Sequence, residues 1–478
     1  MARPEFDIVV IGGGSGGLVV AAGAATLGAK VALIEKHKLG GDCLWYGCVP
    51  SKTLIKSARI AWQMRHADRW SLTPSDPSPD LARVMERVRE VIRGIEPADS
   101  PERFRGLGVD VIFGTGRFVA ADSVEVDGRR LTARTFVIAT GSRPTVPRLP
   151  GIATTPYLTN ETVFALRERV PALIVIGAGP IGSEMAQAFR RLGSEVAVVD
   201  VASQILPRED ADLAAPVMEQ LTIEGVRFSL GAAILAFEGR KGDVRVTLRT
   251  RDGVPKVLAG THLLLAAGRT TNIDDLGLDA ANVRVDNGRI VLVEGLRTTN
   301  PSIYAVGDAA GGHLFTHVAE HHAGIVLRNA LFRMKWAAPS TVVPWCTFTD
   351  PELARVGLSE TEAKRSGSAY KVYRFPFADI DRARAEGETA GLAKIITNHR
   401  GKLLGAAIVG PHAGELIAEF ALALSQGMRA SDLSSVIHAY PTLAQINRRV
   451  ADLRTKEALT PTSKRWLQRL FGLRGAPT

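Results

Sequence analysis

The chain has 478 residues, about three times the ~150 of an average domain, so a single small module is excluded. Its composition, 46% hydrophobic and 23% charged residues, is that of an ordinary globular protein and excludes long disorder. The formal net charge of +10 is spread over the whole length and does not indicate nucleic-acid binding.

The N-terminal residues 1–14 lack a basic region followed by a long apolar run, and no segment offers the ~20 uninterrupted apolar residues that a bilayer span requires. We therefore expect a cytoplasmic protein without a transmembrane segment. The three cysteines are too few for a disulfide scaffold, but Cys43 and Cys48 are close together, while Cys346 stands apart. The close pair indicates a redox or a metal-binding role.

The first forty residues have the pattern of a β-α-β unit. An apolar run at 6–11 predicts a strand, the glycine-rich residues 12–17 predict a turn, and the small residues 18–27 predict a helix. A second buried strand is expected at 31–34 and ends at Glu35.

The same pattern returns later in the chain. A strand at 172–176, a turn at 177–182 and a helix at 183–192 are followed by a strand at 196–199 that ends at Asp200. The sequence therefore predicts two units of one kind.

Both turns match the G-x-G-x-x-G fingerprint, each with a strand before it, a helix after it and an acidic residue about 20 positions later. One glycine makes the turn, the next lets the backbone approach a pyrophosphate, and the third packs the helix on the strand, so the helix N-terminus faces the anion. Glu35 and Asp200 would accept hydrogen bonds from ribose hydroxyls. A turn without a ligand is the alternative for either motif alone, but two dinucleotides in one chain indicate electron transfer between them. The fingerprint glycines are Gly12, Gly14, Gly17, Gly177, Gly179 and Gly182.

The remaining elements suggest a third domain. An amphipathic helix is expected at 81–95, to which we assign no chemistry. Short buried strands that end in glycine are expected at 136–141 and 263–268. A third, which ends in Asp308, is expected at 303–308. After Pro339, short strands at 372–375 and 392–397 and a helix near 415–426 predict a domain of α+β type.

The spacing of Cys43 and Cys48 is wrong for a disulfide within a regular helix. A five-residue step rises about 7.5 Å and turns roughly 140°, whereas a disulfide needs Cα atoms about 4.4 to 6.8 Å apart. The pair can close only if the backbone is distorted, which Gly47 and the glycines at 40–41 permit. A helix is expected after Pro50, and its positive end would stabilise a Cys48 thiolate. A catalytic pair is favoured over two ligands of a zinc site or two free buried thiols.

Residues 40–52, GGDCLWYGCVPSK, resemble the redox-active segment of the pyridine nucleotide-disulfide oxidoreductases, which include dihydrolipoamide dehydrogenase, glutathione reductase and mercuric reductase. The resemblance runs in order from about residue 6 to 452. It implies an α/β fold with two Rossmann-like domains, for FAD and NAD, plus a C-terminal α+β dimerisation domain, and a homodimer. The implied domains are a discontinuous FAD-binding domain at 1–146 and 270–338, an inserted NAD(P)-binding domain at 147–269, the dimerisation domain at 339–455 and a basic tail at 456–478.

The resemblance also implies the cofactor-binding residues. The first fingerprint would hold FAD and the second NADH or NADPH, with Glu35 on the adenosine ribose. Asp308 would contact the flavin ribityl chain, Thr140 and Gly141 would lie along the FAD, and 311–317 would border the isoalloxazine. The residues so implied are Gly12, Gly14, Ser15, Gly17, Glu35, Gly41, Thr140, Gly141, Asp308, His317, Gly177, Gly179, Ile181, Gly182, Asp200 and Gly268.

The family's mechanism implies a role for each catalytic residue. A hydride would pass from the nicotinamide to the flavin and then, as electrons, to the Cys43–Cys48 disulfide. Cys48 would be the charge-transfer thiol and Cys43 the interchange thiol that meets the substrate. Lys52 would supply positive charge beside the flavin, with Glu184 as its ion-pair partner. We interpret Cys346 as a buried structural thiol.

The C-terminal motif departs from the family pattern. Tyr440 and Gln445 stand where the disulfide reductases carry a histidine and its orienting glutamate, an acid-base pair that acts across the dimer interface. A phenol with a reference pKa near 10 cannot be the same base at neutral pH. Tyrosine here resembles mercuric reductase, but the C-terminal vicinal cysteines of that enzyme are absent. His438 is either a displaced base or a surface or interface histidine.

Two further features bear on the partners. The Asp200 carboxylate repels a 2′-phosphate and no arginine follows until Arg208, so NADH is favoured over NADPH. The tail at 463–474 is basic, amphipathic and free of acidic residues. A frayed, solvated end is favoured there over docking to a membrane surface or a protein partner.

We therefore expect an FAD-dependent NAD(P)H oxidoreductase that passes electrons through Cys43 and Cys48 to a small molecule or metal ion, with Tyr440 in the catalytic set and no resident metal. The acceptor would be a metal ion, an electrophile or a disulfide, as in a mercuric reductase-like member. Dihydrolipoamide dehydrogenase is the first alternative. A non-catalytic flavin and dithiol redox sensor is an alternative from another class.

Overall fold

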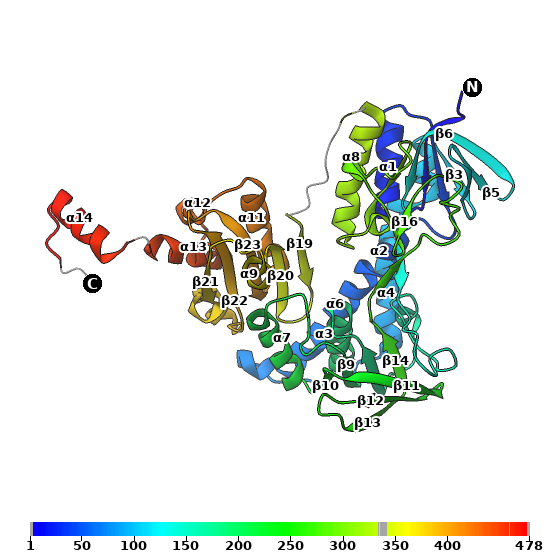
Figure 1. Ribbon diagram of the computed structural model, residues 1–478. Helices are drawn as coiled ribbons and strands as arrows, with labels where there is room; N and C mark the ends of the chain where they lie inside the picture. The colour runs from blue at the N-terminus through cyan, green and yellow to red at the C-terminus, as the bar shows by residue number, and fades with distance from the viewer. Residues whose placement is uncertain (1–2, 333, 335–341, 458, 476–478) are drawn as a thin grey trace.

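The computed structural model describes residues 3–332, 334, 342–457 and 459–475. These residues form two α/β units side by side, a C-terminal α+β domain and a last helix that stands apart (Figure 1). The predicted fold class is therefore confirmed.

The first unit is built on a sheet whose strands follow the order β3-β2-β1-β6, with β18 parallel to β6 and an antiparallel extension through β5 and β4. Strand β18 lies far along the chain, so the unit is discontinuous in sequence. Helices α1 and α8 pack against each other on this sheet. The bounds are β1 (Phe6–Ile11), α1 (Ser15–Thr26), β2 (Val31–Glu35), β3 (Val109–Phe113), β4 (Arg117–Ala120), β5 (Ser123–Val126), β6 (Arg129–Ile138), β18 (Ile303–Ala305) and α8 (Thr316–Phe332).

The predicted β1 at 6–11 is confirmed, but α1 begins at Ser15 and not at residue 18. Glycine has a low helix propensity, which is why the glycine run was expected to stay a turn. Close packing overrides that propensity, because a Cβ at Gly17 would lie 1.9 Å from the Gly12 carbonyl oxygen.

The second unit has a parallel sheet with the strand order β10-β9-β8-β14 and an antiparallel sheet, β11-β12-β13, beside it. Its first helix begins at Pro180, three residues before the predicted start, since proline is favoured in the first turn of a helix. The bounds are β8 (Ala172–Ile176), α6 (Pro180–Arg191), β9 (Glu195–Asp200), α7 (Ala211–Ile223), β10 (Arg227–Leu230), β11 (Ala233–Arg240), β12 (Asp243–Arg249), β13 (Pro255–Gly260) and β14 (His262–Leu265).

Two short strands and a group of helices join the units. Strand β7, where the chain leaves the first unit, pairs antiparallel with β15, where the chain returns to it. Helix α4 covers the predicted residues 81–95 and packs on α3. The bounds are α2 (Gly41–Trp45), α3 (Cys48–Arg65), α4 (Leu81–Ile95), α5 (Pro101–Gly106), β7 (Ser142–Pro144), β15 (Arg269–Thr271), β16 (Val285–Asp286) and β17 (Arg289–Ile290).

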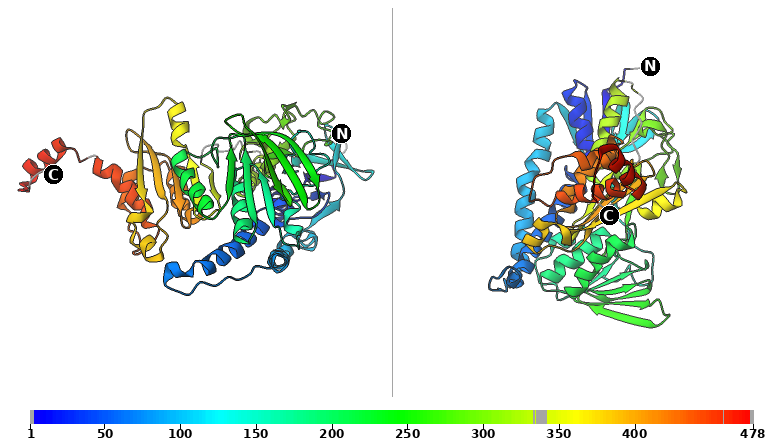
Figure 2. Two further views of the ribbon diagram at one scale, coloured as in Figure 1. Left: turned by 90° about the horizontal axis from the view of Figure 1, so that it is seen from below. Right: turned by 90° about the vertical axis from the view of Figure 1, so that its left-hand side faces the viewer.

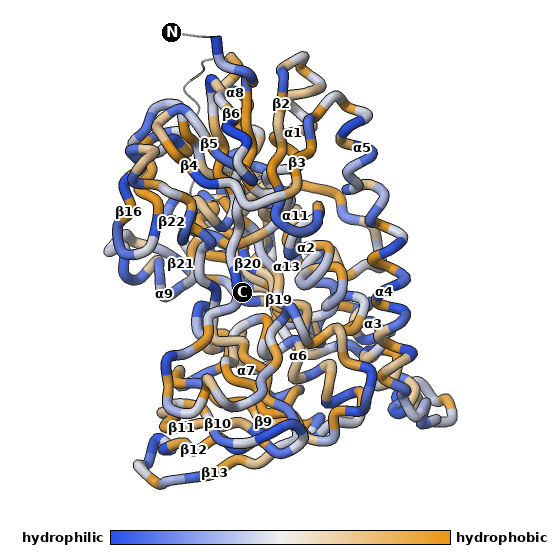
Figure 3. The backbone as a smooth tube through the Cα atoms, turned by 90° about the vertical axis from the view of Figure 1, so that its right-hand side faces the viewer, coloured by the Kyte–Doolittle hydropathy of each residue, from blue (hydrophilic) through white to orange (hydrophobic). Residues whose placement is uncertain are grey.

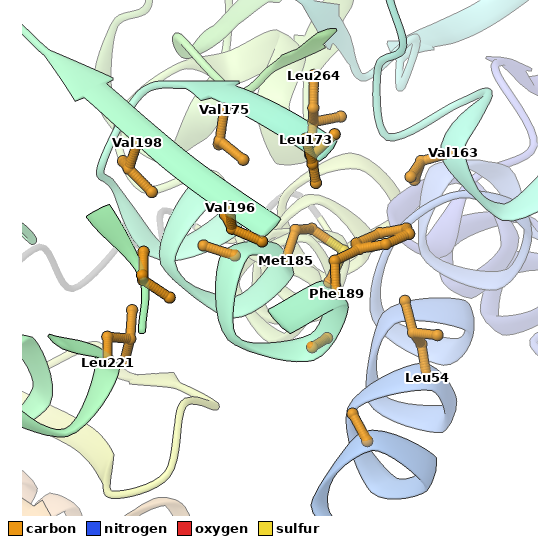
Figure 4. Packing of buried hydrophobic residues seen from close by; sticks show 14 of the residues in the cluster. Leu54, Val163, Leu173, Val175, Met185, Phe189, Val196, Val198, Leu221 and Leu264 are labelled. Atoms are coloured by element: carbon orange, nitrogen blue, oxygen red, sulfur yellow. The ribbon is translucent and has the colours of Figure 1, made fainter. Parts of the chain in front are cut away.

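Helix α3 of the first unit packs on α6 of the second through a shared apolar core. Leu54 points from α3 toward Phe189 and Met185 on α6, with Val163 above them (Figure 4). All four side chains are less than 3% exposed, so their burial is a main source of stability at this junction. The contact fixes the position of the cysteine-bearing helix relative to the second glycine-rich turn.

The C-terminal domain is a five-stranded antiparallel sheet of order β19-β20-β23-β22-β21 with helices around it. The predicted strands at 372–375 and 392–397 and the helix near 415–426 are confirmed within one or two residues. The bounds are β19 (Pro344–Thr347), β20 (Glu352–Gly357), α9 (Glu360–Arg365), β21 (Tyr370–Pro376), α10 (Asp381–Glu386), β22 (Leu392–Asn398), β23 (Leu403–Gly410), α11 (Ala413–Ser425), α12 (Ala430–Ser435) and α13 (Gln445–Glu457).

Buried ion pairs attach this domain to the second unit. Lys394, whose side chain is 1% exposed, donates to Asp210 at 2.9 Å, and Arg355 pairs with Glu209 at 3.0 Å. Breaking such a buried pair is costly because the remaining charge stays desolvated. The C-terminal domain is therefore held against the segment that precedes α7.

Hydrophobic residues gather on the sheets, and hydrophilic residues lie along the outer turns (Figure 3). Among the described residues, no helix is both long and apolar enough to cross a membrane. The predicted domain boundaries stay predictions, and the one between 338 and 339 lies outside the described residues. Helix α14 (Pro461–Phe471) follows α13 and projects away from the body in two perpendicular views (Figures 1 and 2).

Candidate functional site: two glycine-rich turns and a cysteine pair on one cavity

One cavity of about 2350 Å³ runs between the two units and reaches the C-terminal domain. Both glycine-rich turns open onto it, and so do the cysteine pair and the ends of β2 and β9. The predicted site residues that line it are Gly12, Gly14, Ser15, Glu35, Gly41, Cys43, Cys48, Lys52, Thr140, Gly141, Gly177, Gly179, Ile181, Glu184, Asp200, Gly268, Asp308 and His317.

Two predicted glycines lie just behind the cavity wall. A Cβ at Gly17 or Gly182 would come within 1.9 Å of the carbonyl oxygen of Gly12 or Gly177, respectively. These third glycines of each fingerprint therefore pack helix on strand, as their position in the motif predicts.

The acidic residue at the end of each second strand is bound to its own turn. Glu35 Oε2 accepts a hydrogen bond from the Gly13 amide at 2.7 Å, and Asp200 Oδ2 accepts one from the Ala178 amide at 2.6 Å. Each carboxylate keeps lone pairs for a further donor such as a ribose hydroxyl. The two units thus have the same carboxylate-to-amide hydrogen bond at corresponding positions.

The first turn is shaped to take a dinucleotide. Gly41, with φ +58°, packs directly on it, because a Cβ at Gly41 would lie 2.6 Å from the Gly14 Cα. In the second turn, a Cβ at Gly179 would meet nothing within 4 Å, so the backbone there is open to the cavity. Exposed turn amides at a helix N-terminus are suited to a pyrophosphate, and the residues present therefore fit two dinucleotide cofactors.

The backbone between the cysteines is not a continuous helix. Helix α2 ends at Trp45, and α3 begins at Cys48 after Gly47, whose φ of −119° and ψ of −108° are far from helical values. A Cβ at Gly47 would lie 3.0 Å from the Asp42 carbonyl oxygen, so a larger residue at this break would require its neighbours to shift. In the structure Cys43 and Cys48 are free cysteines that are not joined in a disulfide.

The environment of Cys48 favours its thiolate. A hydrogen bond from Cys43 lowers the pKa of Cys48 to about 6, against the effect of burial, and Thr316 and the Lys52 charge act in the same direction as Cys43. The Thr316 hydroxyl lies 3.6 Å from the Cys48 sulfur. The same hydrogen bond, together with burial, raises the pKa of Cys43. The pair therefore holds one thiolate and one thiol at neutral pH.

Lys52 stands beside this pair, one turn along α3. Its Nζ donates to Glu184 Oε2 at 2.9 Å and lies 4.4 Å from the centroid of the Phe348 ring. Burial alone would lower the pKa of Lys52, but the charge and hydrogen bond of Glu184 raise it. The other oxygen of Glu184 accepts a hydrogen bond from the Phe348 amide at 2.9 Å. The Glu184 carboxylate is therefore held in place, and it holds the Lys52 side chain in turn.

Asp308 also lines the cavity, three residues after the end of β18. Its Oδ2 accepts a hydrogen bond from Ser142, and the Nε of Arg269 lies 3.7 Å away. Burial raises the pKa of Asp308. Close by, Thr140 donates to the Asn272 carbonyl at 2.6 Å, which fixes the end of β6.

His317 and its neighbours form an aromatic group in the cavity. The His317 Nε2 lies 2.7 Å from the Pro344 carbonyl oxygen, and the ring stacks on Phe315 at a centroid distance of 5.3 Å. Phe315 in turn stacks on Trp345 at 6.1 Å. Segments 315–317 and 344–345 are thereby joined beside Cys48.

Tyr440 does not line the cavity within the single chain. It is 68% exposed, and its hydroxyl donates to Asp381 Oδ2 at 3.1 Å. That hydrogen bond and the Asp381 charge raise the pKa of Tyr440, so the phenol stays protonated at neutral pH and even less of the basic phenolate is present. Gln445, at the position of the family's glutamate, lies 3.4 Å from the Ala439 carbonyl oxygen.

His438 uses both ring nitrogens within its own domain. Its Nε2 lies 2.9 Å from Glu419 Oε1 and its Nδ1 lies 3.1 Å from the Val436 carbonyl oxygen. The side chain is 6% exposed, and Asn447 donates to the second oxygen of Glu419 at 2.8 Å. This geometry favours a structural role over that of a displaced base.

Cys346 is half-buried and lines the cavity, so it is less enclosed than expected. Burial raises its pKa, and its thiol donates to the Thr347 carbonyl at 3.5 Å. The thiol form is therefore favoured. Among the residues that the structure describes, no group of three or more His, Cys, Asp or Glu side chains is arranged to hold a metal ion.

Three residues of the site have roles that the sequence did not assign. Thr316 contacts Cys48 from 268 positions away, Arg269 contacts Asp308, and Phe348 contacts both Lys52 and Glu184. The one available signal was that Thr316 falls within 311–317, the segment that the family resemblance places beside the isoalloxazine. Nothing in the sequence pattern marks the other two.

Comparison with known proteins gives two family matches. The family model described as pyridine nucleotide-disulphide oxidoreductase matches residues 6–323. The family model described as the dimerisation domain of the pyridine nucleotide-disulphide oxidoreductases matches residues 343–450.

Similar proteins cover nearly the whole chain. Dihydrolipoyl dehydrogenase from Chlamydia muridarum is 37% identical over 92% of this chain and 95% of its own length. Mercuric reductase from Bacillus cereus is 34% identical over 92% of this chain and 70% of its own. The HOCl-induced flavoprotein disulfide reductase RclA from Escherichia coli, solved as a Cu(II) complex, has a TM-score of 0.84 at 30% identity over 95% of this chain and 100% of that one.

Proposed function

Because the chain belongs to the pyridine nucleotide-disulphide oxidoreductase family, whose members use FAD and NAD(P)H, we propose that it takes two electrons from NADH and passes them through FAD and the Cys43–Cys48 pair to a metal ion or another electrophile. The observation that carries the proposal is the single cavity onto which both glycine-rich turns and both cysteines open.

The cofactor sites follow from the two turns. Gly12, Gly14 and Glu35 would hold FAD, and Gly177, Gly179 and Asp200 would hold the nicotinamide nucleotide. When bound, FAD supplies a carrier that accepts a hydride and delivers two electrons. Lys52 would bring positive charge beside it, and Glu184 keeps that charge in place.

The cysteines would exchange electrons in pairs. As the disulfide forms, the Cys43 and Cys48 sulfurs lose two electrons and the thiol proton, and the acceptor gains the electrons. Re-reduction by NADH restores one thiolate and one thiol. Cys48 would be the thiolate, since its pKa is lowered to about 6 by Cys43, Thr316 and Lys52, and Cys43 would meet the acceptor.

The acceptor class follows from the missing base. The pKa of Cys43 is raised, and neither Tyr440 nor Gln445 supplies a general base to take its proton. A soft metal ion does not need such a base, because it displaces the proton when it binds the sulfur. The Cu(II) complex of the E. coli neighbour supports a metal ion as the acceptor.

NADH is the proposed reductant. The Asp200 carboxylate is held by the Ala178 and Ala202 amides, at 2.6 and 2.8 Å, where it would accept from a ribose 2′-hydroxyl. It would repel the phosphate of NADPH at the same place.

The dimerisation domain supports a homodimer in which Tyr440 lies near the partner's cavity. We place the reaction in the cytoplasm, where nicotinamide nucleotides are available and reduced thiols persist.

A second candidate is dihydrolipoamide dehydrogenase, which the 37% identity to the Chlamydia muridarum enzyme favours. It requires lipoamide turnover despite Tyr440. The redox-sensor alternative requires negligible turnover with every acceptor.

Anaerobic titration of the purified yellow protein with NADH, followed by Hg(II), Cu(II), lipoamide and glutathione disulfide, separates the three. We expect NADH oxidation with the metal ions, lost in Cys43→Ser and Cys48→Ser. The matched control Cys346→Ser should retain at least half of the rate, roughly, because its thiol is not part of the pair. The proposal is contradicted if lipoamide is the only acceptor that is turned over. It is also contradicted if none of the four acceptors is turned over.

A further inference from the structure

Helix α14 presents an apolar face that nothing else in the described chain covers. Trp466, Leu467, Leu470 and Phe471 follow helical spacing and are 69%, 38%, 66% and 66% exposed. Residues at these positions share one side of a helix with 3.6 residues per turn. Leu473, just beyond the helix, is 57% exposed as well. Isolated apolar side chains are normal on a surface, but a contiguous group marks an interaction site.

The other face of the same helix is basic. Arg465 and Arg469 lie on the side opposite the apolar group, Lys464 lies at its edge, and Arg474 follows the helix. The sequence from residue 458 to 478 contains no aspartate or glutamate, so four of the ten excess positive charges of the chain lie in this tail. The helix is thus amphipathic and strongly cationic.

The helix is a defined element. Thr460 caps its start by accepting from the Ser463 amide, Pro461 occupies its first turn, and Gly472 ends it with φ +63°. Its 11 residues span about 16 Å, too short to cross a bilayer. Figures 1 and 2 show it beyond α13, away from both nucleotide units.

We propose that α14 docks the protein on an anionic lipid surface, lying in the plane of the interface with its apolar face inserted and its basic face toward the headgroups. An amphipathic, acid-free, Trp-containing helix has the composition of interfacial anchors, and anionic headgroups complement its charge. The function goes beyond the electron transfer proposed above and does not depend on it.

Charge argues against a second copy of this chain as the occupant. The rest of the chain also carries excess positive charge, so a second copy would repel the basic face. The match to the dimerisation domain ends at residue 450, before α14 begins.

The test is flotation of the full-length, flavin-loaded protein with vesicles of phosphatidylcholine alone or mixed with phosphatidylglycerol. We expect the protein to float with the mixed vesicles and not with phosphatidylcholine alone, and to be released by salt. Trp466→Ser/Leu470→Ser/Phe471→Ser should abolish flotation. Arg465→Gln/Arg469→Gln should lower the partition coefficient by roughly tenfold or more.

Two matched controls lie on the surface of the second unit. Val254→Ser/Val257→Ser removes valines that are 58% and 59% exposed, and Lys241→Gln/Arg251→Gln removes two exposed positive charges. Both should float as the parent protein does.

The proposal is overturned if the protein floats equally with both vesicle types or does not float at all. It is also overturned if the controls lose flotation as much as the α14 variants do. A fall in oligomeric state of the α14 variants, measured by analytical ultracentrifugation, with vesicle binding unchanged, overturns it as well, because that result assigns the face to a second copy. NADH oxidation measured without vesicles should stay the same in every variant, which separates this test from that of the proposed function.

Discussion

The Nζ of Lys52 lies 2.9 Å from Oε2 of Glu184, although the two residues are 132 positions apart in the sequence. The pair joins α3, which carries Cys48, to α6, which starts at the second glycine-rich turn. It therefore fixes a positive charge at the place where the two nucleotide units meet the cysteines.

Replacement of Lys52 by Met should destabilise the fold and raise the pKa of Cys48. The buried Glu184 carboxylate would lose its cation, at a cost of about 2 kcal/mol, less than for a fully buried pair because Lys52 is 35% exposed. Thermal unfolding measures the loss. Lys56→Met, on the exposed side of the same helix, is the control, and an equal loss in both variants would contradict the prediction.

The two-electron-reduced protein should show a long-wavelength thiolate-to-flavin absorbance band with a midpoint near pH 6. The pKa of Cys48 is lowered to about 6, first by its hydrogen bond from Cys43, so the thiolate persists above that pH and the band fades as the pH falls through it. Cys43→Ala should shift the midpoint upward, and Cys346→Ser should leave it unchanged. A band that survives in Cys48→Ser would rule out the assignment.

Restoring the family's acid-base pair should create a disulfide reductase. In Tyr440→His/Gln445→Glu, lipoamide turnover should rise by roughly 10²-fold, the usual contribution of a positioned general base. Gln445→Glu alone is the control and should have no effect, since it supplies no histidine. If the parent protein already reduces lipoamide as fast as the double variant, the proposed acceptor class is wrong.

Gly41→Ala should lose flavin. A Cβ at this position would lie 2.6 Å from the Gly14 Cα and would push the cysteine segment off the first glycine-rich turn. The flavin-to-protein ratio, from absorbance, measures the effect. Gly28→Ala is the control for backbone strain, because Gly28 also has positive φ but open space around it, so only about 1 to 2 kcal/mol of strain is expected there. Equal flavin content in both variants would contradict the steric argument.

Asp200→Ser/Val201→Arg should shift the preference toward NADPH. The change removes the carboxylate that repels a 2′-phosphate and adds an arginine at a position that is 74% exposed. One charge-assisted contact is worth about 1.5 to 3 kcal/mol, so the ratio of kcat/KM for NADPH to that for NADH should rise on the order of tenfold or more. Arg249→Ser, on β12, is the control. An unchanged ratio would show that Asp200 does not select the nucleotide.

The strongly patterned elements of the fold could be predicted from the sequence. Strand β1 at 6–11, strand β8 at 172–176 and helix α4 at 81–95 were predicted with the bounds that the structure shows. Each is marked by local hydrophobic periodicity, which depends on neighbouring residues alone. The start of α1 was missed, because the packing of Gly17 against the Gly12 carbonyl is a tertiary contact that no local pattern encodes.

The candidate site was likewise predicted in part from the sequence, and the rest depends on the fold. Spacing alone marked the fingerprint glycines, the acidic ends of both second strands and the Cys43–Cys48 pair, because each of these motifs lies within one short stretch of chain. Only the folded chain brings Thr316 to Cys48 and Phe348 to Lys52, so the local charge and the lowered pKa of Cys48 are tertiary properties. Electrostatic effects depend on distances between groups in space, and a linear sequence does not contain those distances.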